Sequence, residues 1–192
     1  HPITLHSLRL KNILSFGQNE TIVDFSKNGT ISIEGRNIDN GGSNGSGKTA
    51  ILNALCYVIF NKAFNAISLN KLINSTNASK NTLMEVGIDF AKGEDEYEIT
   101  RSRGEAYSVA IIRNGVDITP GKGAAECDAL VQEIFGMSYE LFIRTMIFSG
   151  HSQPFLDLPI AQQRSLIEEL FNISLLSKKA VVLREKIKAT ET

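Results

Sequence analysis

The residues best suited to chemistry lie in one short run, residues 42–49, which read GSNGSGKT and fit the phosphate-binding loop pattern G-x-x-x-x-G-K-[ST]. Glycines let the backbone turn with positive φ and bring its N–H groups close to phosphate oxygens. Lys48 is a positive charge that can reach the β- and γ-phosphates, and the Thr49 hydroxyl is a hard oxygen ligand for Mg²⁺. The run therefore predicts a nucleotide phosphate site.

The sequence on either side of this run predicts the elements that must position it. Residues 30–34 alternate between apolar and polar types and predict a strand before the loop. Residues 50–60 are almost all apolar and predict a mostly buried helix after it, whose positive N-terminal end would point at a bound anion. A chance glycine-rich turn is the alternative, and the strand–loop–helix context argues against it.

A short insertion precedes the loop. Gly35-Arg36-Asn37 already looks like the start of a phosphate loop, but the turn-forming residues 38–41 follow before the true loop begins. These residues predict a longer surface turn. A flap that contacts the nucleotide is the alternative.

The bulk properties indicate an ordinary globular protein. The chain has 192 residues, a formal net charge of −1 and a pI of about 6.4, so any DNA contact must come from a local patch. Cys56 and Cys127 have no metal-ligand spacing and suggest no disulfide framework, which favours a reducing cytoplasm. No run approaches the roughly 18 apolar residues of a membrane span, and no signal peptide is visible, so no membrane association is expected.

The remaining pattern predicts an α/β protein that is rich in strands before and after the loop. The first strand covers residues 3–11, with Leu8 and Leu10 on one face, and turns away at residues 12–17. Residues 70–81 predict a short helix and an exposed loop. An antiparallel meander beside the nucleotide-binding part follows from the hairpin signal Asn114-Gly115. The other predicted elements are strands at 21–25, 82–91, 96–103, 107–114, 116–119 and 143–148, and helices at 124–135, 138–142, 159–171 and 174–192.

Parts of a complete ATPase are missing from the sequence. Hydrolysis needs an acidic residue at the end of a hydrophobic strand and a group that positions the attacking water. The nearest acidic candidate is Asp89, after Val86-Gly87-Ile88, but it sits in a meander strand with polar flanks. No Leu-Ser-Gly-Gly signature is present. The chain is therefore predicted to bind nucleotide phosphate and to be incomplete as a catalyst.

An ordered set of motifs resembles the N-terminal half of the SMC-like ATPases of the SbcC family, and within it the phage members. These ATPases are subunits of DNA double-strand-break repair nucleases. The resemblance covers nearly the whole chain. Its parts are residues 8–16, residues 45–49 with Ala54 and Phe60, residues 72–77, and residues 148–156 with Arg164, Leu166 and Glu169.

The resemblance implies a P-loop NTPase of the ABC/SMC type whose head is split between two lobes. Residues 1–173 would form the N-terminal lobe and residues 174–192 the start of a coiled coil, where Leu176, Ala180, Leu183 and Ile187 follow a short d-a seam. A C-terminal lobe would bring the signature motif, the acidic strand end and the catalytic carboxylate. Two heads are expected to sandwich two molecules of ATP with Mg²⁺, so that ATP binding drives dimerisation and hydrolysis releases it. Implied partners are a second head, a separate metallophosphoesterase nuclease subunit and double-stranded DNA.

The resemblance also assigns roles to single residues. Asn12 and Ser15 lie where the family approaches the nucleotide from the first strand, whereas Leu14 replaces a basic residue of many relatives. Ser149 holds the aligned position of the family glutamine that reaches Mg²⁺ and the attacking water. Gln153, four residues on, is the candidate to replace that glutamine from a shifted loop, and the alternatives are a different coupling or an exposed loop amide at Gln153. The phosphates would be held by Gly42, Asn44, Gly45, Ser46, Gly47 and Lys48, with Thr49 on Mg²⁺.

Other assignments concern the coiled coil and DNA. Arg164 matches an arginine that relays nucleotide state to the coiled coil, and a solvated helix face is its alternative. His151 is expected to be structural. Candidate contacts to DNA phosphates are Lys62, Lys71, Lys80, Arg101 and Arg103, and a solvated surface charge is the alternative favoured for each residue taken singly.

Three other functions compete with a split ATPase head. A self-contained P-loop kinase would be active without a partner, but the acidic strand end and a substrate lid are missing. A transporter ATPase domain would show a signature motif and usually an aromatic adenine platform before the loop, and neither is found. A coiled-coil assembly module with a vestigial loop would have no affinity for nucleotide.

Overall fold

The computed structural model describes residues 2–27, 30–36, 46–64, 67–76, 83–104, 106–121, 123–147 and 155–171. The chain divides into two compact units, His1–Gly136 and Met137–Thr192. Each unit is described by itself.

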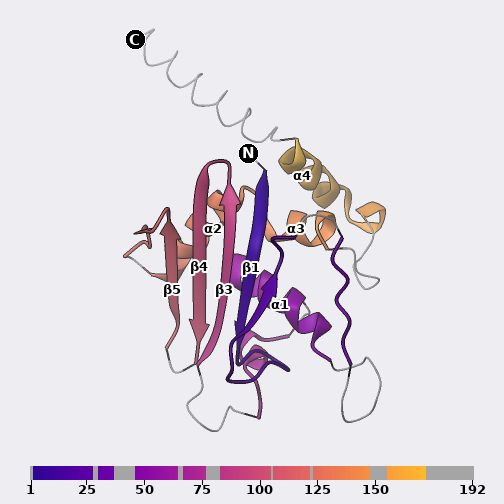
Figure 1. Ribbon diagram of the computed structural model, residues 1–192. Coiled ribbons are helices and arrows are strands. Elements are labelled where there is room, and N and C mark those ends of the chain that lie inside the picture. The colour runs from indigo at the N-terminus through magenta and orange to yellow at the C-terminus, as the bar shows by residue number, and fades with distance from the viewer. Residues whose placement is uncertain are drawn as a thin grey trace. The chain divides into compact units, whose positions relative to one another are not determined.

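The first unit is built on a six-stranded antiparallel sheet with the order β2-β1-β3-β4-β5-β6 (Figure 1). The predicted meander is confirmed. Because β3 pairs with β1, the meander and the first strand belong to one sheet. The strands are β1 (Ile3–Lys11), β2 (Thr21–Asp24), β3 (Met84–Lys92), β4 (Asp95–Arg103), β5 (Ser108–Arg113) and β6 (Val116–Asp117).

Two helices, α1 (Lys48–Phe60) and α2 (Ala124–Phe135), pack behind one face of this sheet (Figure 1). The two-residue period of the strands places alternate side chains on that face, where they form the core with the helices. Gly136 ends α2 in the left-handed conformation with φ 69°, as predicted. The buried strand residues include Leu8, Leu10, Val86, Ile88, Phe90 and Ile99.

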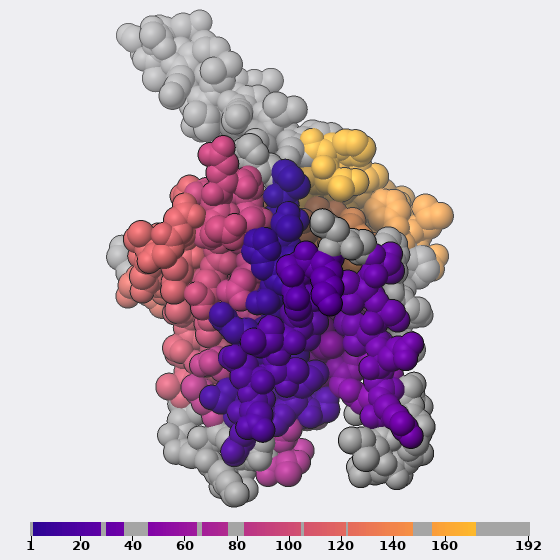
Figure 2. Space-filling view, in the orientation of Figure 1, coloured from indigo at the N-terminus to yellow at the C-terminus, as the bar shows by residue number. Residues whose placement is uncertain are grey.

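The opposite face of the sheet carries polar side chains. Figure 2 shows the indigo and violet N-terminal residues of this unit at the surface turned to the viewer. Asp89 accepts a hydrogen bond from the Ser7 hydroxyl, and its carboxylate lies 3.3 Å from Arg9 Nη1. The carboxylate of Asp89 is therefore engaged on the polar face, away from the core that α1 covers.

Residues 30–36 correct one prediction. They are extended, but none of these seven residues is assigned to a strand. A strand is defined by hydrogen bonds to a neighbour, and no described strand lies beside this segment in the sheet order. Ile31 and Ile33 remain 42% and 44% exposed. The prediction of a strand at 30–34 is therefore wrong for the structure of this single chain.

A short 3-10 helix, η1 (Leu69–Leu72), falls within the polar stretch after α1. It buries Leu72, and the next residue, Ile73, forms an isolated bridge with Ile13. This contact holds the segment that follows η1 against the turn at the end of β1.

The second unit contains α3 (Tyr139–Thr145), a 3-10 turn η3 (Phe155–Asp157) and α4 (Ile160–Leu170). Ser138 caps α3 by accepting a hydrogen bond from the Leu141 N–H at 3.2 Å. The helix then continues to Thr145, and the Met146 N–H still donates to the Phe142 carbonyl. The strand predicted at 143–148 is therefore wrong over residues 143–147, because the capped helix extends further than the short turn predicted there. Phe148 lies outside the described residues.

The predicted helix at 159–171 is confirmed as α4, but its apolar side is mostly exposed. Leu166 is buried, whereas Ile160 and Leu170 are 82% and 57% exposed. The start of the coiled coil predicted at 174–192 lies outside the described residues.

Candidate nucleotide-binding site

Gly47 begins α1 in a conformation that glycine adopts without strain. Its φ of 94° and ψ of 0° are left-handed, and its carbonyl accepts the N–H groups of Ala50 at 3.0 Å and Ile51 at 3.4 Å. A Cβ atom at this position would lie 2.8 Å from Ser15 Oγ and 3.4 Å from the Phe16 ring. Glycine is therefore needed here both for its φ and for this close approach.

Lys48 and Thr49 form the first turn of α1, and both are exposed. Lys48 Nζ donates a hydrogen bond to Ser46 Oγ at 3.1 Å, so the two side chains lie on the same side of the loop. No acidic residue stands in the first turn of α1. The positive end of the helix dipole and the lysine charge therefore both favour an anion at this end of α1.

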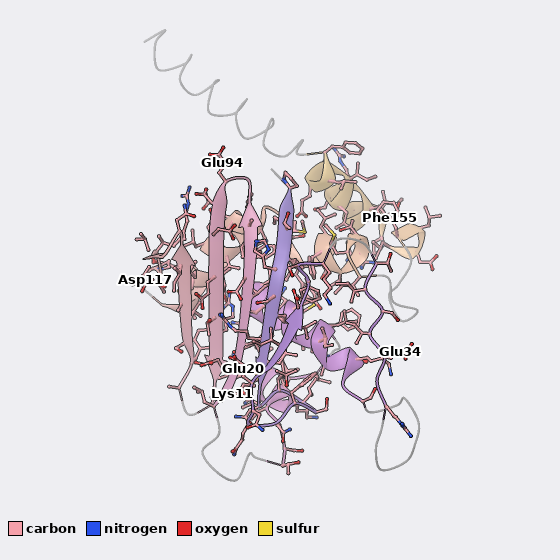
Figure 3. The ribbon with its side chains drawn as sticks, in the orientation of Figure 1. Lys11, Glu20, Glu34, Glu94, Asp117 and Phe155 are labelled. Carbon is pink, nitrogen blue, oxygen red and sulfur yellow. The ribbon has the colours of Figure 1, made fainter. Side chains whose placement is uncertain are left out.

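Gly35 lies beside the end of the loop, although the insertion separates them in sequence. A Cβ atom at position 35 would collide with the Ser46 side chain and come within 3.5 Å of Lys48 Nζ. Figure 3 labels Glu34, the residue before it, on the extended segment. Gly35, which resembles the start of a phosphate loop in sequence, thus lies close to the end of the phosphate loop in space.

The turn at residues 12–17 lies against Gly47, the residue before α1. It joins the end of β1 to the segment before β2, between Lys11 and Glu20, at the end of the sheet opposite to Glu94 (Figure 3). Ser15 is exposed and reaches Gly47, as the distance above shows. The structure thus brings Ser15 to the phosphate loop, where the sequence had placed it only by resemblance.

Asn12 is placed differently from Ser15. Its side chain is only 3% exposed, and Nδ2 donates to the Leu83 carbonyl at 3.0 Å, while its N–H donates to the Gly17 carbonyl at 2.7 Å. These hydrogen bonds of Asn12 therefore stabilise the conformation of the turn itself.

Asn74 is a residue of this region that the sequence analysis did not select. Its amide donates hydrogen bonds to the carbonyls of Leu14 at 2.7 Å and Phe16 at 3.1 Å. The only signal in the sequence was its place in the motif 72–77, to which no role was attached. Asn53 is a second such residue, since it joins the Thr49 carbonyl to the Phe64 N–H.

Several predicted site residues lie outside the described part of the chain. They include Gln153, Ser149 and His151 of the late loop. The others are Gly42, Asn44 and Gly45 of the phosphate loop, and Lys80.

Arg101 corrects the prediction that it contacts DNA. It is fully buried, with Nε donating to the Val58 carbonyl at 2.6 Å and Nη1 donating to Tyr107 and Asp128, each at 2.5 Å. Arg103 is partly buried, and its guanidinium lies 5.6 Å from the centre of the Tyr107 ring. Lys62 and Lys71 are exposed and remain candidates.

Burial also sets the chemistry of the cysteines and tyrosines near α1. It raises the pKa of the Cys56 thiol to about 12 and raises the pKa of Tyr57 and Tyr107. Cys56 is therefore a neutral core residue, as expected for a small hydrophobe in the apolar helix.

Among the described residues, no group of three or more histidine, cysteine or acidic side chains is arranged to hold a metal ion. No helix in the described part of the chain is both long and apolar enough to cross a membrane.

Comparison with known proteins adds a family and relatives. The model of the family described as "AAA domain" matches residues 7–191. Exonuclease subunit 2 of Enterobacteria phage T4 is 30% identical over 177 residues, which cover 91% of this chain and 29% of that protein. The DNA double-strand break repair Rad50 ATPase of Sulfolobus acidocaldarius is 26% identical over 94% of this chain and 18% of its own length. The chain thus spans less than a third of each of these relatives.

Solved structures show the fold. The Smc head domain of Pyrococcus furiosus matches with a TM-score of 0.63 and 21% identity, over 99% of this chain and 47% of that chain. A structure from a study of ATP-driven dimerization of SMC ATPases matches with a TM-score of 0.57 and 24% identity, over 86% of this chain and 98% of that chain. The predicted fold class, an α/β P-loop NTPase of the ABC/SMC type, is confirmed.

Proposed function

Because this chain belongs to the AAA domain family and resembles the N-terminal half of an SMC-like ATPase of the SbcC family, we propose that it is the ATP-binding part of the ATPase subunit of a DNA repair or recombination nuclease. The T4 relative is named as an exonuclease subunit and the Sulfolobus relative as a double-strand break repair ATPase. These names favour this proposal over a self-contained kinase.

The observation that carries the proposal is the junction of the loop with α1. Gly47 adopts a left-handed conformation at the start of the helix, Lys48 follows it exposed, and Ser15 closes in from the turn. A glycine-containing loop that leads into a helix N-terminus fits the triphosphate of ATP. The residues present therefore fit the nucleotide that the family implies.

The roles proposed for single residues follow from this geometry and the resemblance. Lys48 pairs with the β- and γ-phosphates, and backbone N–H groups of residues 42–47 surround them. Thr49 supplies a hydroxyl ligand to Mg²⁺, which neutralises phosphate charge when bound. Ser15 supports the loop at Gly47. Gln153 is proposed to bind Mg²⁺ and to position the attacking water.

The proposed partners follow from the split head. A C-terminal lobe of the same protein supplies the signature motif and the acidic strand end, and a strand from it can pair with the extended segment 30–36. A second head closes over ATP, and a separate metallophosphoesterase subunit cuts the DNA. Double-stranded DNA is bound by the assembly, with Lys62 and Lys71 as contact candidates on this chain.

Removal of the lysine charge tests the proposal. In K48A, loss of a charge-assisted contact worth about 1.5–3 kcal/mol should weaken ATP binding roughly ten- to a hundredfold. Titration of a fluorescent ATP analogue in the presence of Mg²⁺ measures the dissociation constant. The matched control is K27A, which removes another exposed lysine outside the loop and should leave the affinity unchanged. Equal affinities for the wild type and K48A would exclude the proposed role of Lys48.

A further inference from the structure

We propose that Asn74 is a positioning residue of the nucleotide site: it holds the turn at residues 12–17 in the conformation that brings Ser15 and Phe16 against the phosphate loop. The inference rests on the proposed function, because it assumes that the loop at residues 42–49 binds a nucleotide.

Asn74 makes most of its polar contacts to this one turn. Its side-chain amide donates to the carbonyls of Leu14 at 2.7 Å and Phe16 at 3.1 Å, and its backbone N–H donates to the Asn12 carbonyl at 2.9 Å. Its own Oδ1 accepts the Thr76 N–H at 2.9 Å, which orients the amide. Asn74 is only 7% exposed, so water does not compete freely for these carbonyls.

The turn needs such a clamp because its backbone is strained. Asn12 and Leu14 have φ values of 53° and 49°. Asparagine tolerates the left-handed region, but leucine rarely adopts it, and such a conformation persists only where the surroundings enforce it. The Leu14 N–H donates to the Leu72 carbonyl at 2.7 Å, so both sides of the strained peptide are held by the segment around η1.

The clamp acts at the residues that meet the loop. Ser15 lies directly between the two carbonyls that the Asn74 amide holds, those of residues 14 and 16. Its Oγ and the Phe16 ring are the nearest neighbours of Gly47 that an added Cβ would meet. A relaxed turn would therefore withdraw both side chains from the start of α1.

The segment that carries Asn74 is itself fixed. Leu72 is fully buried, and Ile73 bridges to Ile13. Contacts between residues about sixty positions apart thus hold the turn at residues 12–17 in place. Preorganisation of this kind raises affinity because the bound geometry does not have to be formed at binding.

The experiment compares N74A and N74D with the wild type in the nucleotide titration, at a temperature where circular dichroism shows every variant folded. Alanine removes the amide, whereas aspartate keeps its shape and the bond from Thr76 but cannot donate to the two carbonyls. Both variants should bind the ATP analogue roughly five- to fiftyfold more weakly, as expected for the loss of two hydrogen bonds.

The matched control is N114A. Asn114 also uses both ends of its amide, donating to Asp95 at 2.7 Å and accepting from the Glu96 N–H at 2.8 Å, but it lies in the β5–β6 hairpin. Loss of its hydrogen bonds should lower stability without changing the affinity for the nucleotide by more than about twofold.

A second substitution separates positioning from general destabilisation. Glycine adopts φ near 49° without the steric penalty of leucine, so L14G should let the turn keep its shape without the clamp. The double variant L14G/N74A should therefore recover at least about threefold of the affinity lost in N74A. A purely structural role for Asn74 predicts no such recovery.

The possible outcomes distinguish the inference from the function on which it rests. If K48A loses affinity while N74A and N74D bind as the wild type does, Asn74 is no positioning residue and the nucleotide site stands. If the wild type does not bind, or K48A binds equally well, the proposed site itself fails. Should N74A not fold, N74D and L14G/N74D provide the same comparison.

Discussion

Gly47 meets two requirements of the candidate site because it has no side chain. The left-handed backbone demands glycine, and the space beside it is already taken by Ser15 and Phe16. Leu14 shows the opposite case, since this leucine has a positive φ that glycine would adopt with less strain. Backbone conformation and close packing thus constrain which residue types can stand around the loop.

Cys56 allows a test of burial at the residue scale. Its pKa is raised from 9.0 to about 12 in the folded chain, so the unfolded state loses the thiol proton first as the pH rises. The stability due to the neutral thiol is therefore complete below pH 9 and is lost between about pH 9 and pH 12, by about 1.4 kcal/mol per pH unit. The wild type should lose about 2 kcal/mol more than C56A between about pH 8 and pH 10.5 in urea unfolding.

This comparison isolates one group. Tyr57 and Tyr107 also have a raised pKa, but they are present in both proteins, so their contribution cancels in the difference. An equal loss in the wild type and C56A would show that the thiol is not kept neutral by burial.

At the scale of elements, Arg101 joins three parts of the first unit. From β4 it donates to the Val58 carbonyl near the end of α1, to Tyr107 before β5, and to Asp128 on α2. Asp128 also accepts from Asn61, which follows α1. A charge that the sequence offered for DNA binding instead ties the two helices to the sheet.

Removal of Arg101 should therefore destabilise the first unit. R101A breaks a buried ion pair and leaves the Val58 carbonyl without this donor, which should lower the free energy of unfolding by about 2–4 kcal/mol, since Asp128 stays partly exposed. The matched control is R113A, because the Arg113–Asp95 pair links neighbouring strands at the surface and should contribute about 0–1 kcal/mol. Urea unfolding with an unchanged m-value measures both. A similar small effect in the two variants would argue against the role of Arg101.

At the scale of the whole molecule, the sequence has the phosphate-loop motif, for which we propose ATP, but it has no Leu-Ser-Gly-Gly signature. It spans less than a third of the relatives named above. Asp89, the nearest acidic candidate in the sequence, lies beside Ser7 and Arg9 on the polar face of the sheet. The position of Asp89 agrees with the proposal that the acidic strand end of the site comes from a C-terminal lobe.

Steady-state ATP hydrolysis tests this view. The chain alone should bind ATP with no turnover above that of K48A, because the acidic strand end and the signature motif are proposed to come from the C-terminal lobe. Addition of the C-terminal part of the protein should then restore turnover. Lys48-dependent hydrolysis by the chain alone would show that a complete catalytic site lies within these 192 residues.

The sequence by itself determined the local features of this protein. The two-residue period predicted β1 and the meander, the apolar run predicted α1, and Gly136 predicted the end of α2, because each depends on neighbours a few positions away. The motif at residues 42–49 and the wider resemblance pointed to the family that the comparison shows, and ATP is the nucleotide proposed for it. Ser15 was placed near the loop by resemblance, and the structure brings it there.

The tertiary structure decided what depends on distant partners. Residues 30–34 have the pattern of a strand but no described neighbour to pair with, and Arg101 has the charge of a DNA contact but lies buried against α1 and α2. The clamp of Asn74 on the turn at residues 12–17 joins segments about sixty residues apart. Pattern and propensity report the conformation of a short segment, whereas pairing, burial and support of a site arise only when the chain brings remote segments together.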